Sequence, residues 1–162
     1  MATDPPADLT LSPINGEPGT IADWVTTFQL AAVILDPFTN ESAWLIETAG
    51  RLLTHFREAD CRVAFIVTGT ADEARSFLGP WADKVLTFAD PGRATVKGLG
   101  LNELPAFVQV RGDLHVAAAA EGWDPVEWHQ VALSLADNMS WSAPLVPVPG
   151  DPSPYAGSAA AG

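Results

Sequence analysis

Apolar residues follow two different periods along the middle of the chain. Residues 30–35 are an unbroken apolar run of strand length, and residues 61–67 are apolar apart from Arg62, which predicts strands that are covered on both faces. Between them, apolar positions recur every three or four residues from 40 to 59, which predicts a helix. A helix between two such strands is typical of a crossover connection, so we expect these strands to be parallel.

Capping and turn residues define the shorter elements. Thr70 and Glu73 form a predicted capping box, and Asp124 followed by Pro125 marks the start of the last long helix. The other expected elements are a short helix after residue 20, a strand over 84–88, helical turns over 93–98, and a hairpin of 106–110 with 114–117. This order predicts an α/β fold with a mixed β-sheet flanked by helices.

Both ends of the chain lack a periodic apolar pattern. Residues 1–19 contain four prolines, and residues 142–162 contain five of the 14 prolines of the chain. Such segments do not form long helices or inner strands. We therefore expect an irregular N-terminal arm over 1–19, one domain over 20–141, and an extended Pro/Ala/Gly-rich tail over 142–162.

The segment before the predicted hairpin carries a family resemblance. Residues 99–108 read Leu-Gly-Leu-Asn-Glu-Leu-Pro-Ala-Phe-Val, which is similar to the thioredoxin superfamily signature in which a cis-proline precedes a strand. The turn at residues 90–92, Asp-Pro-Gly, is similar to a loop of the thiol-disulfide and peroxiredoxin-like members. The chain thus resembles a thioredoxin-like protein over about residues 20–139. This resemblance implies a cis bond between Leu104 and Pro105.

Redox-active thioredoxin relatives carry Cys-x-x-Cys at the start of the helix that follows the first central strand. Here residues 36–44 read Asp-Pro-Phe-Thr-Asn-Glu-Ser-Ala-Trp, without a cysteine. Disulfide exchange needs one thiolate to attack and a second thiol to resolve, so we expect no dithiol activity and no enzyme. We interpret Cys61, the single cysteine, as structural. The alternative is a one-cysteine thiol redox protein that uses Cys61.

Other catalytic and metal-binding patterns are missing from the sequence. His55, His115 and His129 fall on three separate predicted elements without metal-ligand spacing. The chain contains no Gly-x-Ser-x-Gly elbow, no phosphate-binding glycine loop and no dinucleotide fingerprint. We therefore expect no metal and no cofactor.

The charge is strongly negative and unevenly placed. The chain has 20 acidic and 8 basic residues, a net charge of −12, and both ends carry only acidic charge. Such a surface repels phosphate backbones and anionic headgroups, so we expect no nucleic acid and no membrane insertion. A protein partner with a basic or extended peptide surface fits better, and solubility alone is the alternative explanation. Without a leader or a spanning segment of about 20 apolar residues, we expect a cytoplasmic protein of open oligomeric state.

Together these features predict a non-catalytic thioredoxin-like binding module that acts as an adaptor, assembly factor or accessory subunit. The resemblance implies a groove for an extended peptide, lined here by Pro37, Phe38, Thr39, Asn40, Leu104 and Pro105. Trp123 and Trp141 lie outside the predicted core positions, so either a partner or the folded-back tail covers them. Residues 122–125, Gly-Trp-Asp-Pro, are similar to a motif of the thioredoxin-like hydrogenase-assembly chaperones.

Overall fold

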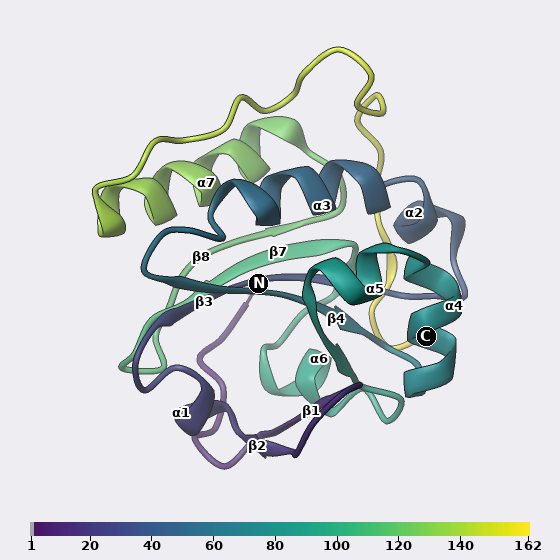
Figure 1. The fold of residues 1–162 in the computed structure, drawn as a ribbon. Coiled ribbons are helices and arrows are strands. Elements are labelled where there is room, and N and C mark those ends of the chain that lie inside the picture. Colours follow the sequence, from purple (N-terminus) through teal and green to yellow (C-terminus); the bar gives the residue numbers. More distant parts are fainter. Residues whose placement is uncertain (1) are drawn as a thin grey trace.

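The computed structural model describes residues 2–162 as a mixed β-sheet with helices on both faces (Figure 1). The strands are β1 (Thr10–Pro13), β2 (Gly19–Thr20), β3 (Gln29–Leu35), β4 (Cys61–Val67), β5 (Leu86–Ala89), β6 (Glu103–Leu104), β7 (Ala106–Val110), β8 (Val116–Glu121) and β9 (Ser158–Ala159). The helices are α1 (Ile21–Trp24), α2 (Asn40–Ala43), α3 (Ile46–His55), α4 (Ala71–Leu78), α5 (Trp81–Lys84), α6 (Ala94–Gly98) and α7 (Pro125–Met139). The expected α/β architecture is confirmed.

The central strand is β3, and its two neighbours run in opposite directions. β4 pairs with β3 in parallel over the whole strand, and β7 pairs with β3 antiparallel. The full order of the main sheet is β2-β1-β5-β4-β3-β7-β8, while β6 and β9 form a separate two-stranded sheet. Because β3, β4 and β5 are parallel, the loops that come after them meet at one edge, which we call the carboxyl edge of the sheet.

Each face of the sheet packs against its own apolar core. Successive strand residues point to opposite faces, so Val33 of β3 joins the core under α3 and α7, while its neighbour Ile34 joins the core beside α1, α6 and β1. Both side chains are fully buried. β3 and β4 are apolar apart from Gln29 and Arg62 near their first residues, and this composition reflects coverage on both faces, as Figure 1 shows.

The helix expected over 40–59 is divided into α2 and α3. The amide of Leu45 donates to the carbonyl oxygen of Ser42 at 3.2 Å, which tightens the chain into a turn between the two helices. This turn places Leu45 in the core, whereas Trp44 is 58% exposed. The periodicity alone does not reveal the break, because Leu45 still falls on the apolar stripe.

The N-terminal arm is not irregular throughout, contrary to the expectation for residues 1–19. β1 pairs antiparallel with both β2 and β5, which extends the main sheet. Leu9 and Leu11 are buried and drive this pairing, because they bring apolar surface to the α1 side of the sheet. Two alternating residues among prolines are too short a pattern to predict a strand.

Two further boundaries differ from the expected ones. α5 occupies residues 81–84, so the strand expected over 84–88 begins only at Leu86. In the hairpin, Leu114 adopts a left-handed φ of 67°, and the amide of Arg111 donates to the carbonyl oxygen of His115 at 2.9 Å. This longer turn moves the start of β8 to Val116 and lets β8 run to Glu121.

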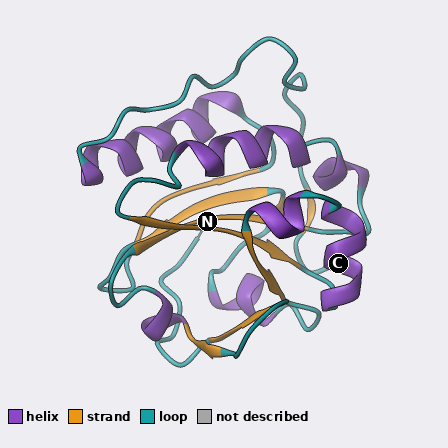
Figure 2. Cartoon of the chain, in the orientation of Figure 1, coloured by secondary structure: helices purple, strands orange, loops and turns teal. Residues whose placement is uncertain are grey.

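The proline-rich tail lies against the domain. From residue 141 it passes over α7 and α3 and then descends to the carboxyl edge, almost entirely as loop (Figure 2). Ser142 places its carbonyl oxygen 2.8 Å from Nε2 of His55, and Asp151 forms an ion pair of 2.8 Å with Arg51. The tail contains one short strand, β9, which the sequence did not indicate.

Candidate functional site

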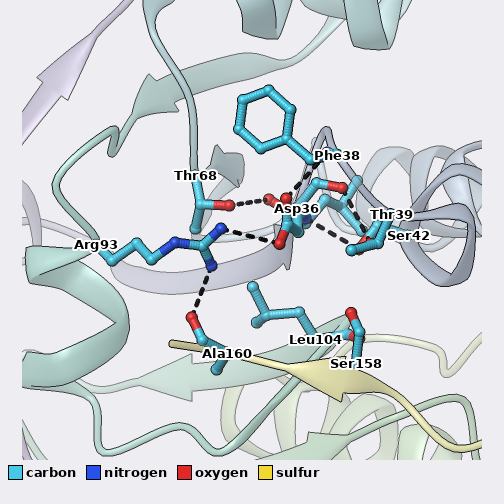
Figure 3. Close-up of polar contacts among 10 residues, drawn as sticks. Asp36, Phe38, Thr39, Ser42, Thr68, Arg93, Leu104, Ser158 and Ala160 are labelled. Carbon is cyan, nitrogen blue, oxygen red and sulfur yellow. Dashed lines mark hydrogen bonds and ion pairs between the residues drawn. The ribbon is translucent and has the colours of Figure 1, made fainter. Parts of the chain in front are cut away.

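A buried ion pair lies at the carboxyl edge of the sheet (Figure 3). Asp36 comes directly after β3, and its Oδ2 lies 3.0 Å from Nη2 of Arg93. The side chains of Asp36 and Arg93 are 3% and 15% exposed. Taking such charges out of water is costly, and the opposite charge and the hydrogen bonds offset this cost.

The loop that contains Asp36 is fixed by short-range hydrogen bonds. Asp36 Oδ1 accepts a hydrogen bond from the amide of Phe38 at 2.9 Å, and the amide of Asp36 donates to the buried hydroxyl of Ser42 at 2.9 Å. The hydroxyl of Thr39 donates to the carbonyl oxygen of Asp36 at 3.3 Å. These bonds set the position of the Asp36 carboxylate before any ligand arrives.

Arg93 reaches the pair from the loop after β5. Its backbone has a left-handed φ of 60°, an uncommon conformation for a residue with a side chain. The carboxylate of Asp90 accepts the amide of Thr95 at distances of 3.2 and 3.1 Å and the amide of Val96 at 3.4 Å, which secures the start of α6. The Asp-Pro-Gly turn and α6 thus aim the guanidinium at Asp36.

The third part of the site is β6, which ends at the cis peptide bond between Leu104 and Pro105. This cis bond was expected and is confirmed. β9 of the tail pairs antiparallel with β6, and Leu104 lies opposite Ser158. A second hydrogen bond of Arg93, from Nη1 to the carbonyl oxygen of Ala160 at 2.7 Å, connects the tail to the ion pair.

The residues predicted to line a peptide groove fall into two groups. Pro37 and Phe38 line a shallow hollow of about 420 Å³ against α4, and Phe38 is 65% exposed. Leu104 and Pro105 are buried instead, beside β9. Thr39 holds the Asp36 loop, as described above.

The remaining members of that predicted set lie at the margins of the site. Asn40 is exposed at the start of α2. Trp123 is fully buried among core residues, and its Nε1 donates to the carbonyl oxygen of Pro152 at 2.8 Å. The expectation that Trp123 lies outside the core is therefore corrected, because the tail covers it. Trp141 is 40% exposed, and its Nε1 donates to the carbonyl oxygen of His55 at 3.1 Å.

Cys61 lies at the opposite end of the strands. It is the first residue of β4, so about 20 Å of strand separates it from the carboxyl edge. The residue is 8% exposed, and burial raises the pKa of its thiol to about 12, against a smaller lowering effect of a backbone hydrogen bond with Ala31. The Sγ contact with the carbonyl oxygen of Arg62 is long, at 3.7 Å.

Residues 2–162 show neither a metal-binding cluster nor a membrane-spanning helix. In that part of the chain, no group of three or more His, Cys, Asp or Glu side chains is placed to hold a metal ion. Within the same range, no helix combines the length and the apolar character that crossing a bilayer requires. The expectation of no cofactor stays a prediction.

Sequence reasoning missed the ion pair and Ser42. The sequence does carry a signal for Asp36, because it is a charged residue directly after an apolar strand. Asp36 is 2% exposed, and a charge is buried to this extent only where a partner compensates it. The sequence carries no such signal for its partner Arg93, because 57 residues separate Arg93 from Asp36. In the sequence Ser42 is only one residue of a loop without cysteine, although its buried hydroxyl accepts a bond from the loop backbone.

No family model and no curated protein match the chain. Solved structures do match it: DsbF of Mycobacterium tuberculosis has a TM-score of 0.65 and 12% identity, covering 80% of this chain and 98% of that chain. Peroxiredoxin Q of Xanthomonas campestris has a TM-score of 0.65 and 14% identity, covering 83% of this chain and 94% of that chain. The chain has the thioredoxin-like fold. A hypothetical protein of Sinorhizobium meliloti shares this fold over 99% of this chain and 94% of that chain, with a TM-score of 0.67 and 13% identity.

These comparisons correct two expectations drawn from the thioredoxin-like sequence features. We expected a non-catalytic binding module of the adaptor or assembly-factor kind, and no enzyme. The solved structures that the chain resembles include disulfide oxidoreductases and peroxiredoxin Q, which are redox enzymes. Of the expectations drawn from the sequence, the alternative, a one-cysteine thiol redox protein that uses Cys61, is the one in the same class of chemistry as these neighbours.

Proposed function

We propose that the protein is a one-cysteine thiol redox protein with Cys61 as its reactive group. The observation that carries this proposal is the combination of the fold with a single thiol at the first residue of a central strand. Cys61 comes directly after the exposed residue Asp60, and 8% of its own surface is accessible. The likeness to thiol-disulfide oxidoreductases and peroxiredoxin Q supports the same class of chemistry.

The oxidant that fits a single cysteine is a hydroperoxide. The Cys61 thiolate attacks one peroxide oxygen, the O–O bond breaks, and the sulfur becomes a sulfenic acid while water or an alcohol leaves. A small thiol then attacks the sulfenic sulfur, which releases water and leaves a mixed disulfide. A second small thiol reduces this disulfide and restores the Cys61 thiol.

Burial determines how this chemistry depends on pH. With a thiol pKa of about 12, only about one Cys61 in 10⁵ is a thiolate at pH 7. The rate of the first step should therefore rise about tenfold for each pH unit above neutrality. Local opening of the first residues of β4 accelerates it further, because strand ends open more readily than strand centres.

The test measures consumption of hydrogen peroxide in the presence of excess dithiothreitol. We expect turnover above the reagent blank for the natural chain and its loss in Cys61→Ser. Val63→Ala is the matched control, because Val63 is also 8% exposed on β4 and carries no thiol. A carbon nucleophile selective for sulfenic acids should label Cys61 by mass spectrometry. Equal turnover in Cys61→Ser would overturn the proposal.

The expected partner, a protein with a basic or extended peptide surface, stays a prediction. The net charge of −12 supports a basic surface. Pull-down of the natural chain at low and at high ionic strength measures this preference, because screening weakens attraction between exposed charges.

A further inference from the structure

A polar hollow lies at the end of the sheet opposite the buried ion pair, which we call the amino edge. Its volume is about 370 Å³, at the small end of the range of about 300–1,000 Å³ for ligand pockets. It is lined by the start of β3, the residue before β4, the turn after β7 and the end of α7. Its polar side chains include Gln29, Asp60, Arg111 and Asn138.

A chain of hydrogen bonds through the core orients one of these side chains. The hydroxyl of Ser134 on α7 donates to Oε1 of Gln109, and Nε2 of Gln109 donates to Oε1 of Gln29 at 2.7 Å. Gln109 is fully buried, and burying an amide costs free energy unless its polar atoms are bonded. Because Oε1 of Gln29 accepts this bond, the Nε2 group of Gln29 is the part that can donate to a ligand in the hollow.

Two opposite charges line the same hollow. One N–H of the Arg111 guanidinium donates to Oδ2 of Asp113 at 2.8 Å, and a guanidinium has five N–H donors, so others can bind a ligand. Asp60 is exposed, and the C-terminal end of α7 beside it favours positive charge. A ligand that matches this lining carries a carboxylate for Arg111 and Gln29 and an ammonium group for Asp60.

The hollow lies beside Cys61. Gln29 is the register partner of Cys61 in the parallel pair of β3 and β4, and neighbouring strands are about 4.8 Å apart. The side chain of Cys61 belongs to the core under α3 and α7, the same face of the sheet on which Gln29 bonds to Gln109. Asp60 directly precedes Cys61 in the chain. A small thiol bound in the hollow is therefore held close to Cys61.

We propose that the hollow at the amino edge binds the α-amino-acid group of a small thiol, with the carboxylate on Arg111 and Gln29 and the ammonium group beside Asp60. The role of this thiol as the reductant of Cys61 rests on the proposed function. The bound thiol attacks the sulfenic sulfur of Cys61, water leaves, and a mixed disulfide forms. Binding itself depends only on the hollow.

Three reductants separate the two charges of the ligand. L-Cysteine carries both the carboxylate and the ammonium group, cysteamine lacks the carboxylate, and 3-mercaptopropionate lacks the ammonium group. The chain is treated with hydrogen peroxide, the excess is removed, and one thiol is added. The sulfenic acid that remains at Cys61 is then followed over time with the carbon nucleophile that labels it.

The rates are compared among the natural chain, Arg111→Gln and Asp60→Asn. The matched controls are Arg75→Gln and Asp72→Asn on α4, because the side chains of Arg75 and Arg111 are both 43% exposed. Comparing variants with one and the same reductant cancels differences in intrinsic thiol reactivity.

We expect Arg111→Gln to slow reduction by L-cysteine and by 3-mercaptopropionate about tenfold and to leave the rate with cysteamine unchanged. Asp60→Asn should slow L-cysteine and cysteamine about threefold, because an exposed charge pair contributes less, and should leave 3-mercaptopropionate unchanged. The controls should match the natural chain with all three thiols. Equal rates in the natural chain and both variants would overturn the proposal and leave the redox function in place.

Binding is measured separately with S-methyl-L-cysteine, which has no free thiol. We expect it to shift the NMR signals of the Gln29 side-chain amide, and to do so more weakly in Arg111→Gln. The matched compound without a carboxylate, S-methylcysteamine, should shift them less. If no sulfenic acid forms at Cys61, the redox function fails, whereas these shifts still support the binding site. A natural chain whose Gln29 signals do not respond contradicts the proposal, whatever the outcome of the redox assay.

Discussion

The two ends of β3 and β4 bury an ionisable group in opposite ways. At the carboxyl edge, Asp36 is 2% exposed and meets Arg93, so its charge has a partner. At the other end, burial holds the thiol of Cys61 in the neutral form. Asp36 thus has an ion-pair partner at one end of the sheet, whereas Cys61 at the other end ionises only when the strand opens or the pH is high. The surroundings of a group matter more for its chemistry than its residue type.

Removing the charge partner at the carboxyl edge should have the largest effect. In Arg93→Ala the carboxylate of Asp36 stays buried without its ion pair, which should lower the free energy of unfolding by about 3–5 kcal/mol. Urea denaturation measures this loss. The control is Arg75→Ala, because the Arg75–Asp72 pair is exposed and such pairs contribute about 1 kcal/mol or less. Equal losses in the two variants would remove the distinction between a buried and an exposed pair.

Cys61 should react about a thousandfold more slowly with iodoacetamide at pH 7 than a thiol with a pKa of 9.0, because its pKa is about 12. Stability should change with pH in the matching direction. The neutral thiol favours the folded chain below pH 9, and this advantage is lost as the pH rises from about 9 toward about 12. Alkylation rates from pH 7 to 10 check the first statement, with the urea-unfolded chain as reference. A rate that does not change with pH would contradict both.

The anchor of the tail should contribute less than the buried pair. Asp151 accepts hydrogen bonds from Arg51, Thr48 and the amide of Val148. Because the Arg51 side chain is 33% exposed, Asp151→Ala should cost only about 1–2 kcal/mol. Hydrogen exchange over residues 142–151 should accelerate in this variant and stay unchanged in Ser153→Ala. Exchange that remains slow would show that the prolines alone hold the tail.

The smallest effect concerns the exposed hairpin turn near Cys61. A hydrogen bond from Arg111, then one from the amide of His115, lowers the pKa of Asp113 to about 2. A lowered pKa stabilises the folded chain above pH 4, and this contribution disappears as the pH falls from about 4 to about 2. In Arg111→Ala the pKa of Asp113 should return toward 3.8, as measured by NMR titration. A pKa that stays low would assign the shift to the turn backbone.

The sequence allows the sheet to be predicted well where apolar runs and caps are continuous. β4 has the predicted bounds, and the predicted capping box of Thr70 and Glu73 is present with both of its hydrogen bonds. Such local signals succeed because neighbouring residues form them. β1 was missed for the opposite reason, since its pairing depends on β5, which lies more than 70 residues further along the chain.

The candidate site was harder to predict than the fold. The loop after β3 and the cis bond at Pro105 were expected, but the link between them through Arg93 and Ala160 joins three distant segments. The path of the tail was equally hidden, because proline-rich sequences are extended whether or not they are bound. Sequence patterns predict where helices and strands lie, whereas the hydrogen-bond partners of single polar side chains are visible only in the structure.

One helix of this protein should tolerate substitution less than its pattern implies. On α3, Thr48, Arg51 and His55 are spaced by three and four residues, which is typical of a solvated polar stripe. In the structure all three contact the tail. Thr48 is hydrogen-bonded to Asp151, Arg51 to Leu145 and Asp151, and His55 to Ser142. Positions that look free to drift in evolution are therefore expected to vary together with the proline-rich tail, and a relative that lacks the tail should also lack this stripe.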